Sequence, residues 1–312
     1  MTGGPGARTA VAGAVLLAAS VAVMWALGRP QTPAADTAVR TVADCAAVVT
    51  LGAAVVPWLD DAGRRRAELV ERAGRPLLIG AAVWLLAELA RLVVQAARAA
   101  GRPATTVEAA TVIRYATDTT LGRSVVFSLV CATLVAVLAT AATLRGGALL
   151  AATAGVAAAG LCARTLSGHL IHSPLGGAAI AVHALAAALW CGVLAALLLT
   201  VGHRGRWARV LPRFSQLSLW CVAALSAGGV AGAVVALDAP SDLVFTGYGR
   251  VLMAKLALTA GLLVLGWRNR TDWLPAARRH HATAAVSRTR ALTELAVMGA
   301  ALTGAAALTV TG

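Results

Sequence analysis

Ionisable side chains inside long apolar runs are the first candidates for chemistry in this sequence. The residues of this kind are Asp44, Glu88, Arg91, His183, Lys255 and Glu294. An ionisable group within the hydrocarbon of a membrane costs about 2.5–3.5 kcal/mol on insertion scales. Each one is therefore expected to have a partner or a function.

Three histidines lie close together in the chain. His169 and His172 are at positions i and i+3, and Pro174 then begins the apolar run that contains His183. A rise of 1.5 Å per residue puts His183 about 12 Å into that helix. Neutral imidazole is a common ligand of copper, zinc and haem iron. The spacing predicts a metal or haem site formed by these histidines, with Asp44 as an oxygen ligand; the alternative is packed, hydrogen-bonded histidines.

The remaining candidates have simpler interpretations. Glu88 and Arg91 are three residues apart, so they are expected to pair, either to hold helices together or to gate a path. Lys255 lies near the end of its run and either extends to the membrane surface or faces a vestibule. Glu294 follows Arg288 and Arg290 and is interpreted as structural. Trp190, at i+7 from His183, is expected on the same helix face.

Several classes of chemistry have no motif here. The sequence contains no GxxxxGK[ST], no HExxH and no GxGxxG after a strand, so an enzyme is not expected. The five cysteines lie in apolar runs without a CxxC pair, which favours packing over disulfides. Four methionines form no thioether series for Cu(I). The net charge of +14 comes almost wholly from arginines in short loops, which argues against nucleic-acid binding.

The elements that would position these residues are transmembrane helices. Of 312 residues 59% are hydrophobic and 13% charged, and the mean hydropathy is +0.78. A span needs about 20 apolar residues. The sequence predicts an all-α polytopic transmembrane bundle of eight to nine spans, in lipid, over residues 10–28, 39–58, 77–97, 123–144, 148–167, 176–201, 214–237, 250–267 and 290–310.

Loop charge predicts the orientation. Most arginines fall in the loops that share a side with the N-terminus, so that side is expected to be cytoplasmic. The first run, with Arg8 before it and small residues after it, also fits a signal peptide within residues 1–35. Its length favours a retained helix, which gives a multi-pass protein of the cytoplasmic (inner) membrane with the N-terminus inside.

The C-terminal half carries a combined pattern. Arg213-Phe214-Ser215 precedes one span, Tyr248-Gly249-Arg250, Leu252 and Lys255 begin the next, and Asn269-Arg270 ends it. Upstream, His183, Ala186, Trp190 and Gly192 follow an H-x-x-A-x-x-x-W-x-G spacing. The chain resembles the copper-resistance protein D (CopD) family over about residues 165–300, and over the first 160 residues by helix count. We therefore expect N-terminal helices over 1–160 (about five spans) and a CopD-like domain over 165–312 (about four spans).

The resemblance implies copper uptake or delivery across the cytoplasmic membrane, with copper of unspecified oxidation state as the ion handled. It marks His183, Tyr248, Arg250 and Lys255 as motif positions, and an extracytoplasmic copper-binding protein becomes an expected partner. Two alternatives stay open. One is a b-type haem electron-transfer protein that uses two of the same histidines, and the other is a copper chaperone or assembly partner without transport.

Overall fold

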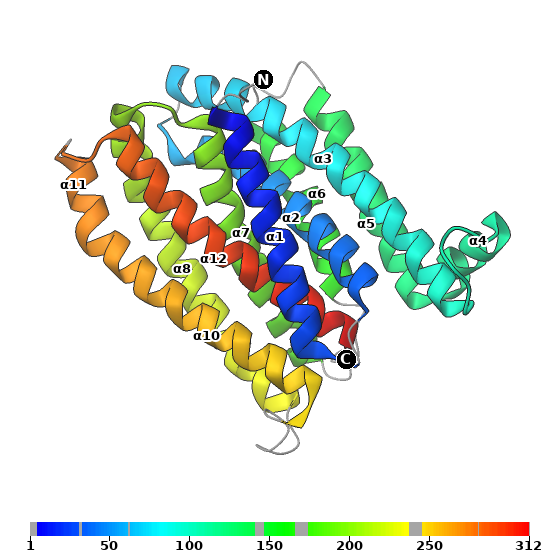
Figure 1. Ribbon diagram of the computed structural model, residues 1–312. Coiled ribbons are helices and arrows are strands. Elements are labelled where there is room, and N and C mark those ends of the chain that lie inside the picture. Colours follow the sequence, from blue (N-terminus) through cyan, green and yellow to red (C-terminus); the bar gives the residue numbers. More distant parts are fainter. Residues whose placement is uncertain are drawn as a thin grey trace.

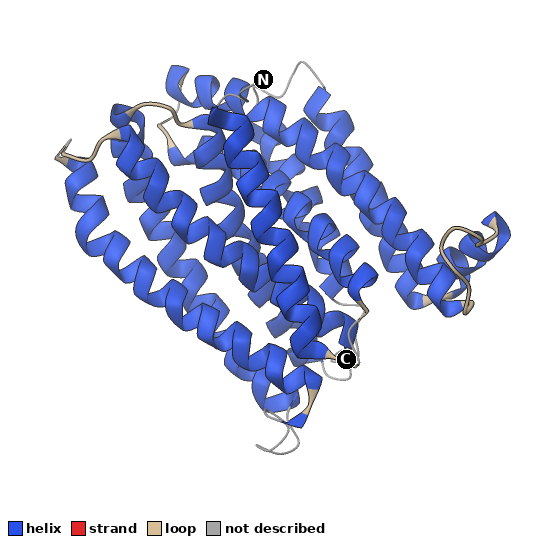
Figure 2. Cartoon of the chain, in the orientation of Figure 1, coloured by secondary structure: helices blue, strands red, loops and turns tan. Residues whose placement is uncertain are grey.

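The chain folds into a bundle of long helices joined by short connections (Figures 1 and 2). The computed structural model describes residues 5–30, 33–61, 63–140, 147–165, 174–236, 245–279 and 281–311, and these ranges contain no strand. The helices are α1 Pro5–Gly28, α2 Ala34–Val55 with a 3-10 turn Val56–Leu59, α3 Arg64–Ala99, α4 Ala109–Asp118, α5 Thr120–Thr140, α6 Gly147–Thr165, α7 Pro174–Thr200, α8 Arg204–Ala236, α10 Gly247–Arg268, a π-helical turn Asn269–Trp273, α11 Leu274–Arg278 and α12 Ala284–Thr311.

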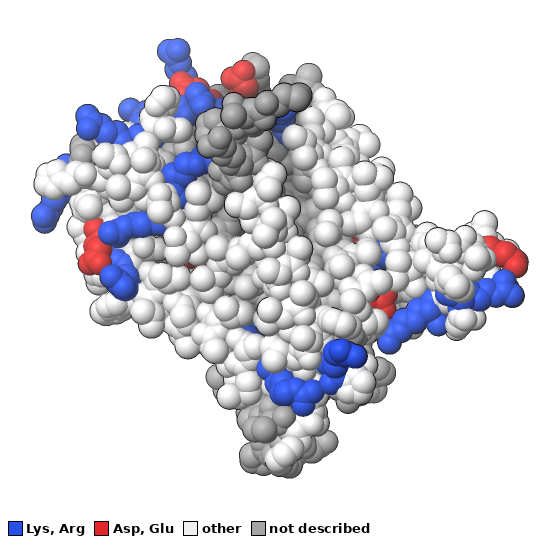
Figure 3. Space-filling model, viewed as in Figure 1, with Lys and Arg blue, Asp and Glu red and all other residues white. Residues whose placement is uncertain are grey.

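The all-α polytopic fold expected from the sequence is confirmed. Each of the nine predicted ranges overlaps a helix, and seven described helices are long and apolar enough to cross a membrane. Helix α6 is a shorter apolar helix, and α8 is not one of the seven. Figure 3 shows charged side chains gathered toward the ends of the visible face, with an uncharged belt between them. Such a belt is what the hydrocarbon layer requires.

Close backbone contact between α2 and α7 organises the core. Gly52 and Gly192 face each other so tightly that a Cβ on either glycine would collide with the backbone of the other helix. Thr50, two residues before Gly52 and fully buried, contacts α3, where a Cβ on Gly80 would lie 2.6 Å from its Oγ1. Small residues permit such packing between membrane helices, where van der Waals contact is a main source of association. Helix α2 is consequently the centre around which α3 and α7 pack.

Three ion pairs join α8 to the turn between α2 and α3 and to the beginning of α3. Arg206 pairs with Glu68 (3.2 Å), Arg209 with Asp60 (3.4 Å) and Arg213 with Asp61 (2.6 Å). We call this end of the bundle, which carries Arg64–Arg66, Arg204–Arg213 and Arg268–Arg279, the arginine-rich end. The end where α1 finishes, α10 begins and α4 projects is the opposite end (Figure 1).

The first helix packs into the bundle against α10 and α12. Met24 of α1 is buried in a cluster with Val251 and Ala307. Arg250, one of the family-motif positions, donates to the carbonyl oxygens of Leu27 (2.9 Å) and Arg29 (2.9 Å). These two acceptors lie at the C-terminal end of α1, where carbonyl groups have no intrahelical partner. Arg250 therefore fastens the end of α1 to the start of α10.

Candidate functional site

A cavity lies between α7, α8, α10 and α12 in the interior of the bundle. Its volume is about 90 Å³, and it is enclosed mostly by aliphatic side chains. Its polar, aromatic and sulfur-bearing lining residues are His183, Trp190, Cys191, Lys255, Thr259 and Met298. The motif residues His183, Trp190 and Lys255, spread over some 70 positions of the sequence, thus face one space. We call it the histidine cavity.

His183 is held in one tautomer at the wall of this cavity. Its Nδ1 lies 2.8 Å from the carbonyl oxygen of Leu225 on α8. A carbonyl can only accept a hydrogen bond, so Nδ1 carries the proton and the neutral ring has its lone pair on Nε2. Histidines that bind metals commonly donate their other ring N–H to a carbonyl or carboxylate in this way. Nε2 of His183 is thus prepared to act as a ligand.

Two glycines of α8 make room for the imidazole. A Cβ on Gly228 would come within 2.9 Å of the His183 Cβ, and one on Gly229 would lie 3.4 Å from its Cε1. Any side chain at Gly228 would therefore displace the ring or the helix. The two glycines thus allow His183 to sit against the Leu225 carbonyl.

Lys255 lines the histidine cavity rather than extending to the membrane surface. It lies near enough to His183 for the two to interact electrostatically. Among the described residues no carboxylate or hydrogen-bond acceptor pairs with its Nζ. Of the two positions considered for Lys255, its place in the lining of the histidine cavity fits the interior one.

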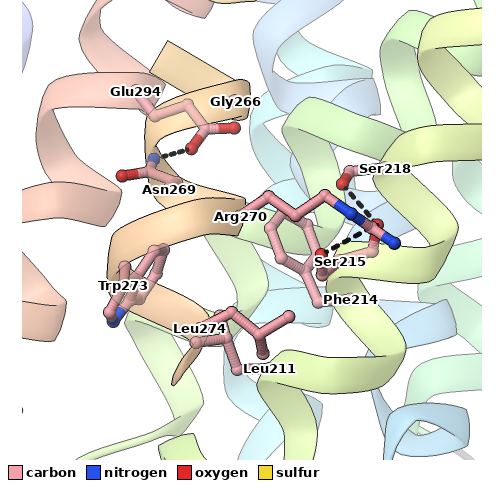
Figure 4. A pocket seen from close by; sticks show the side chains of 10 residues that line it. All are labelled: Leu211, Phe214, Ser215, Ser218, Gly266, Asn269, Arg270, Trp273, Leu274 and Glu294. Atoms are coloured by element: carbon pink, nitrogen blue, oxygen red, sulfur yellow. Dashed lines mark hydrogen bonds between the residues drawn. The ribbon is translucent and has the colours of Figure 1, made fainter. Parts of the chain in front are cut away.

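A second, smaller cavity of about 20 Å³ lies toward the arginine-rich end (Figure 4). Glu294 of α12, only 3% exposed, accepts from Asn269 Nδ2 at 2.6 Å and from Trp190 Nε1 at 3.1 Å. The neighbouring Arg270 donates to Ser215 Oγ (3.0 Å) and to the Ser215 carbonyl (3.2 Å). We call this second space the glutamate cavity.

The two cavities share a wall. Trp190 lines the histidine cavity, and its indole N–H bonds to Glu294, which lines the glutamate cavity. The motif residues thus form a column through the helix group α7, α8, α10 and α12, from Lys255 and His183 past Trp190 to Glu294 and Arg270. A π-helical turn, a feature frequent at functional sites, carries Asn269 and Arg270 at the inner end of the column.

The partners of Glu294 differ from the sequence-based interpretation. Arg288 and Arg290 are its nearest arginines in the chain, but Arg288 donates to the Leu198 carbonyl (3.4 Å). Within the described part of the chain Glu294 has no cationic partner, and its two donors are neutral groups. A buried carboxylate without a counter-charge is costly, so this position favours the binding of a proton or a cation. Its contact with Trp190 could not be predicted from the spacing of nearby residues, because Trp190 lies on another helix, α7.

Glu88 and Arg91 form a separate buried network between α3 and α5. The Arg91 Nη1 to Glu88 Oε2 distance is 3.0 Å, and both residues are at most 2% exposed. Glu88 also accepts from Ser128 Oγ (3.0 Å) and Trp84 Nε1 (3.3 Å). The predicted pairing is present, but neither residue lines the histidine cavity or the glutamate cavity.

The other predicted site residues are not gathered at one point. Asp44 of α2 pairs with Arg40 at 3.7 Å and is not part of the lining of either cavity. Tyr248 is half-buried in the first turn of α10, next to Arg250. His169 and His172 lie outside the described residues. Within the described ranges no three His, Cys, Asp or Glu side chains are placed to hold one metal ion. Cys131, Cys191 and Cys221 are buried.

The fold and the two cavities define a polytopic helical membrane protein with buried polar groups in its C-terminal helices. Residues 208–308 match the family described as copper resistance protein D, and residues 31–174 match the copper resistance protein D-like N-terminal domain. The chain belongs to the copper resistance protein D family. No curated protein and no solved structure gives a significant match. Family membership suggests a membrane protein of copper resistance or copper transport.

Proposed function

We propose that this protein takes up copper across the cytoplasmic membrane from the extracytoplasmic side, and that the histidine cavity is its binding site. The observation that carries the proposal is the hydrogen bond from His183 Nδ1 to the Leu225 carbonyl, which leaves Nε2 as a lone-pair donor at the cavity. The family supplies the identity of the ion. An imidazole fixed in this tautomer is a suitable copper ligand.

The column of buried groups supports passage rather than storage. His183 and then Glu294, a carboxylate without a counter-charge, offer a cation two successive binding sites along the column. In this proposal His169 and His172 deliver copper to His183, with Asp44 as a further oxygen ligand near the entrance. The arginine-rich end is cytoplasmic, as loop charge favours, and an extracytoplasmic copper-binding protein is the donor.

The small size of the histidine cavity favours an ion over a haem. Pockets for drug-sized ligands have volumes of about 300–1,000 Å³, several times larger than this space. No specific feature favours electron transfer as a second function.

Copper accumulation tests the proposal. Radioactive copper uptake would be compared in cells that produce the wild-type protein, His183→Ala, or His203→Ala, an exposed histidine at the arginine-rich end. We expect His183→Ala to lower the protein-dependent uptake at least tenfold, or about 1.4 kcal/mol of transition-state stabilisation, and His203→Ala to leave it unchanged.

Three outcomes would contradict uptake through His183. Wild-type uptake by the His183→Ala variant would remove the histidine from the path. Copper binding without accumulation in sealed vesicles would indicate a chaperone or an assembly partner. A Soret band that depends on His183 would indicate a haem protein.

A further inference from the structure

Two sulfur-containing residues line the histidine cavity together with His183. Cys191 of α7 is 6% exposed and Met298 of α12 is 3% exposed, and both line the cavity. The Cys191 Sγ is a free thiol with no hydrogen-bond partner in the ranges that the structure describes. Thiolate and thioether are soft ligands that select Cu(I) over harder cations. The cavity therefore contains donors that the histidine spacing alone does not suggest.

The sulfur ligands lie deeper in the bundle than the imidazole. Cys191 follows His183 by eight residues, which is about 12 Å along α7. Met298 is one helical turn from Glu294, the residue bonded to Trp190 beside Cys191. Imidazole and sulfur thus occupy successive levels rather than one coordination sphere. This agrees with the absence, among the described residues, of three His, Cys, Asp or Glu side chains around one point.

A carboxyl group lies next to the sulfur level. Cys191 is close enough to Glu294 for the two groups to interact electrostatically. Glu294 receives hydrogen bonds from Asn269 and Trp190, both neutral, and has no cationic partner among the described residues. Coordination of a soft cation by Sγ displaces the thiol proton. The Glu294 carboxylate is the neighbouring base that receives this proton.

We propose that Cys191 Sγ and Met298 Sδ form a Cu(I) site at the inner end of the histidine cavity. This inference rests on the proposed function and adds the oxidation state of the cargo. When Cu(I) leaves His183 Nε2, the Cys191 S–H bond breaks, an S–Cu bond forms, and the proton moves to the Glu294 carboxylate. Copper stays Cu(I) throughout. Return of the proton to Sγ breaks the S–Cu bond, so the ion is released.

Cu(I) affinity and copper spectroscopy test the site. The detergent-purified full chain would be titrated anaerobically with Cu(I) in competition with bathocuproine disulfonate, and its copper ligands identified by X-ray absorption. We compare Cys191→Ser and Met298→Leu with the matched variants Cys221→Ser and Met253→Leu, whose parent residues do not line the cavity. We expect Cys191→Ser to weaken Cu(I) binding at least tenfold and to lower the number of sulfur atoms seen around copper. Met298→Leu should weaken binding less, and the two controls should bind as wild type does.

Cysteine alkylation tests the site in the wild-type protein, so its result does not depend on the folding of a variant. Wild-type protein is alkylated with iodoacetamide in the presence or absence of Cu(I), and each cysteine is quantified by mass spectrometry. Cu(I) should protect Cys191 and leave the labelling of Cys221 unchanged. Equal alkylation of Cys191 with and without Cu(I), or wild-type affinity and sulfur scattering in Cys191→Ser, overturns the sulfur site.

Failure of this inference can be distinguished from failure of the proposed function. If His183→Ala abolishes uptake while Cys191→Ser keeps wild-type Cu(I) affinity, copper transport stands and the sulfur site is wrong. If Cys191→Ser loses Cu(I) affinity while uptake is normal in both variants, the sulfur site stands and transport through this cavity is wrong.

Discussion

Two buried glutamates of this protein differ in the charge of the groups that hold them. Glu88 bonds to the Arg91 guanidinium, whereas Glu294 bonds only to the neutral Trp190 and Asn269 among the described residues. A paired charge is typical of a structural role, because the cost of burying each ion is offset by the other. An uncompensated carboxylate is typical of a site that exchanges protons or cations. We therefore expect a structural role for Glu88 and a functional role for Glu294.

The structural role of Glu88 predicts a specific pattern in variants. Glu88→Leu leaves the Arg91 guanidinium buried without a counter-charge and should destabilise the protein by about 3–5 kcal/mol. Glu88→Leu with Arg91→Met removes both charges and should restore most of that stability. Thermal unfolding in detergent measures both effects. The double variant should also take up copper normally. A stable double variant without uptake would show instead that the pair gates the path.

Residue types predicted part of the candidate site. The spacing of His183 and Trp190 placed both on one helix face, and both line the histidine cavity. The role of Glu294 could not be predicted, because its partners come from α7 and the π-helical turn rather than from neighbouring positions of α12. Cys191 and Met298 were missed for the same reason. Single sulfur residues on two helices carry no spacing signal until the helices are packed.

At the scale of elements, apolar run length predicted the long helices because each run must bury its backbone in lipid. Helix α4 was not predicted, since its ten residues are too few for a span and their apolar positions are interrupted by polar ones. Helix α3 begins at Arg64, well before the predicted start at residue 77, because charged residues such as Glu68 continue the helix beyond the apolar run. Hydropathy identifies membrane-spanning segments, but it does not identify helical segments that lie outside the membrane.

Helix packing gives a prediction at the contact of α2 with α7. Gly192→Ala would place a Cβ against the carbonyl oxygen of Val48, with backbone on both sides. Overpacking of this kind costs about 1–3 kcal/mol, so we expect a lower unfolding temperature in detergent. The matched control is Gly155→Ala on an exposed face of α6, where a Cβ meets nothing within 4 Å. Helix propensity there favours alanine by up to about 1 kcal/mol. Equal unfolding temperatures for the two variants would contradict the close contact.

At the scale of the whole molecule, charge divides the bundle into two unequal ends. Arginines concentrate at the arginine-rich end, where Arg206, Arg209 and Arg213 also join α8 to the turn after α2 and to the beginning of α3. Retention of positive charge during insertion favours a cytoplasmic location for this end. The histidine cavity would then lie nearer the extracytoplasmic surface and the glutamate cavity nearer the cytoplasm.

Orientation is testable with single introduced cysteines. Thr106→Cys lies in the exposed connection between α3 and α4, and Arg64→Cys lies at the arginine-rich end, where the side chain is 95% exposed. A membrane-impermeant maleimide should label Thr106→Cys in intact spheroplasts and Arg64→Cys only after permeabilisation. Wild-type protein measures the background from the native thiols. The reverse labelling pattern would invert the proposed orientation and, with it, the direction of uptake.

The hydrogen bond between Trp190 and Glu294 has a thermodynamic consequence for the two cavities. One side chain lines the first cavity and binds the carboxylate of the second. If an occupant of the histidine cavity shifts that indole, it changes the proton affinity of Glu294, and linkage requires protonation of Glu294 to change the occupant's affinity by the same factor. A tenfold effect in either direction corresponds to about 1.4 kcal/mol. Protonation of Glu294, and with it the proton gradient across the membrane, would then be coupled to occupancy of the histidine cavity.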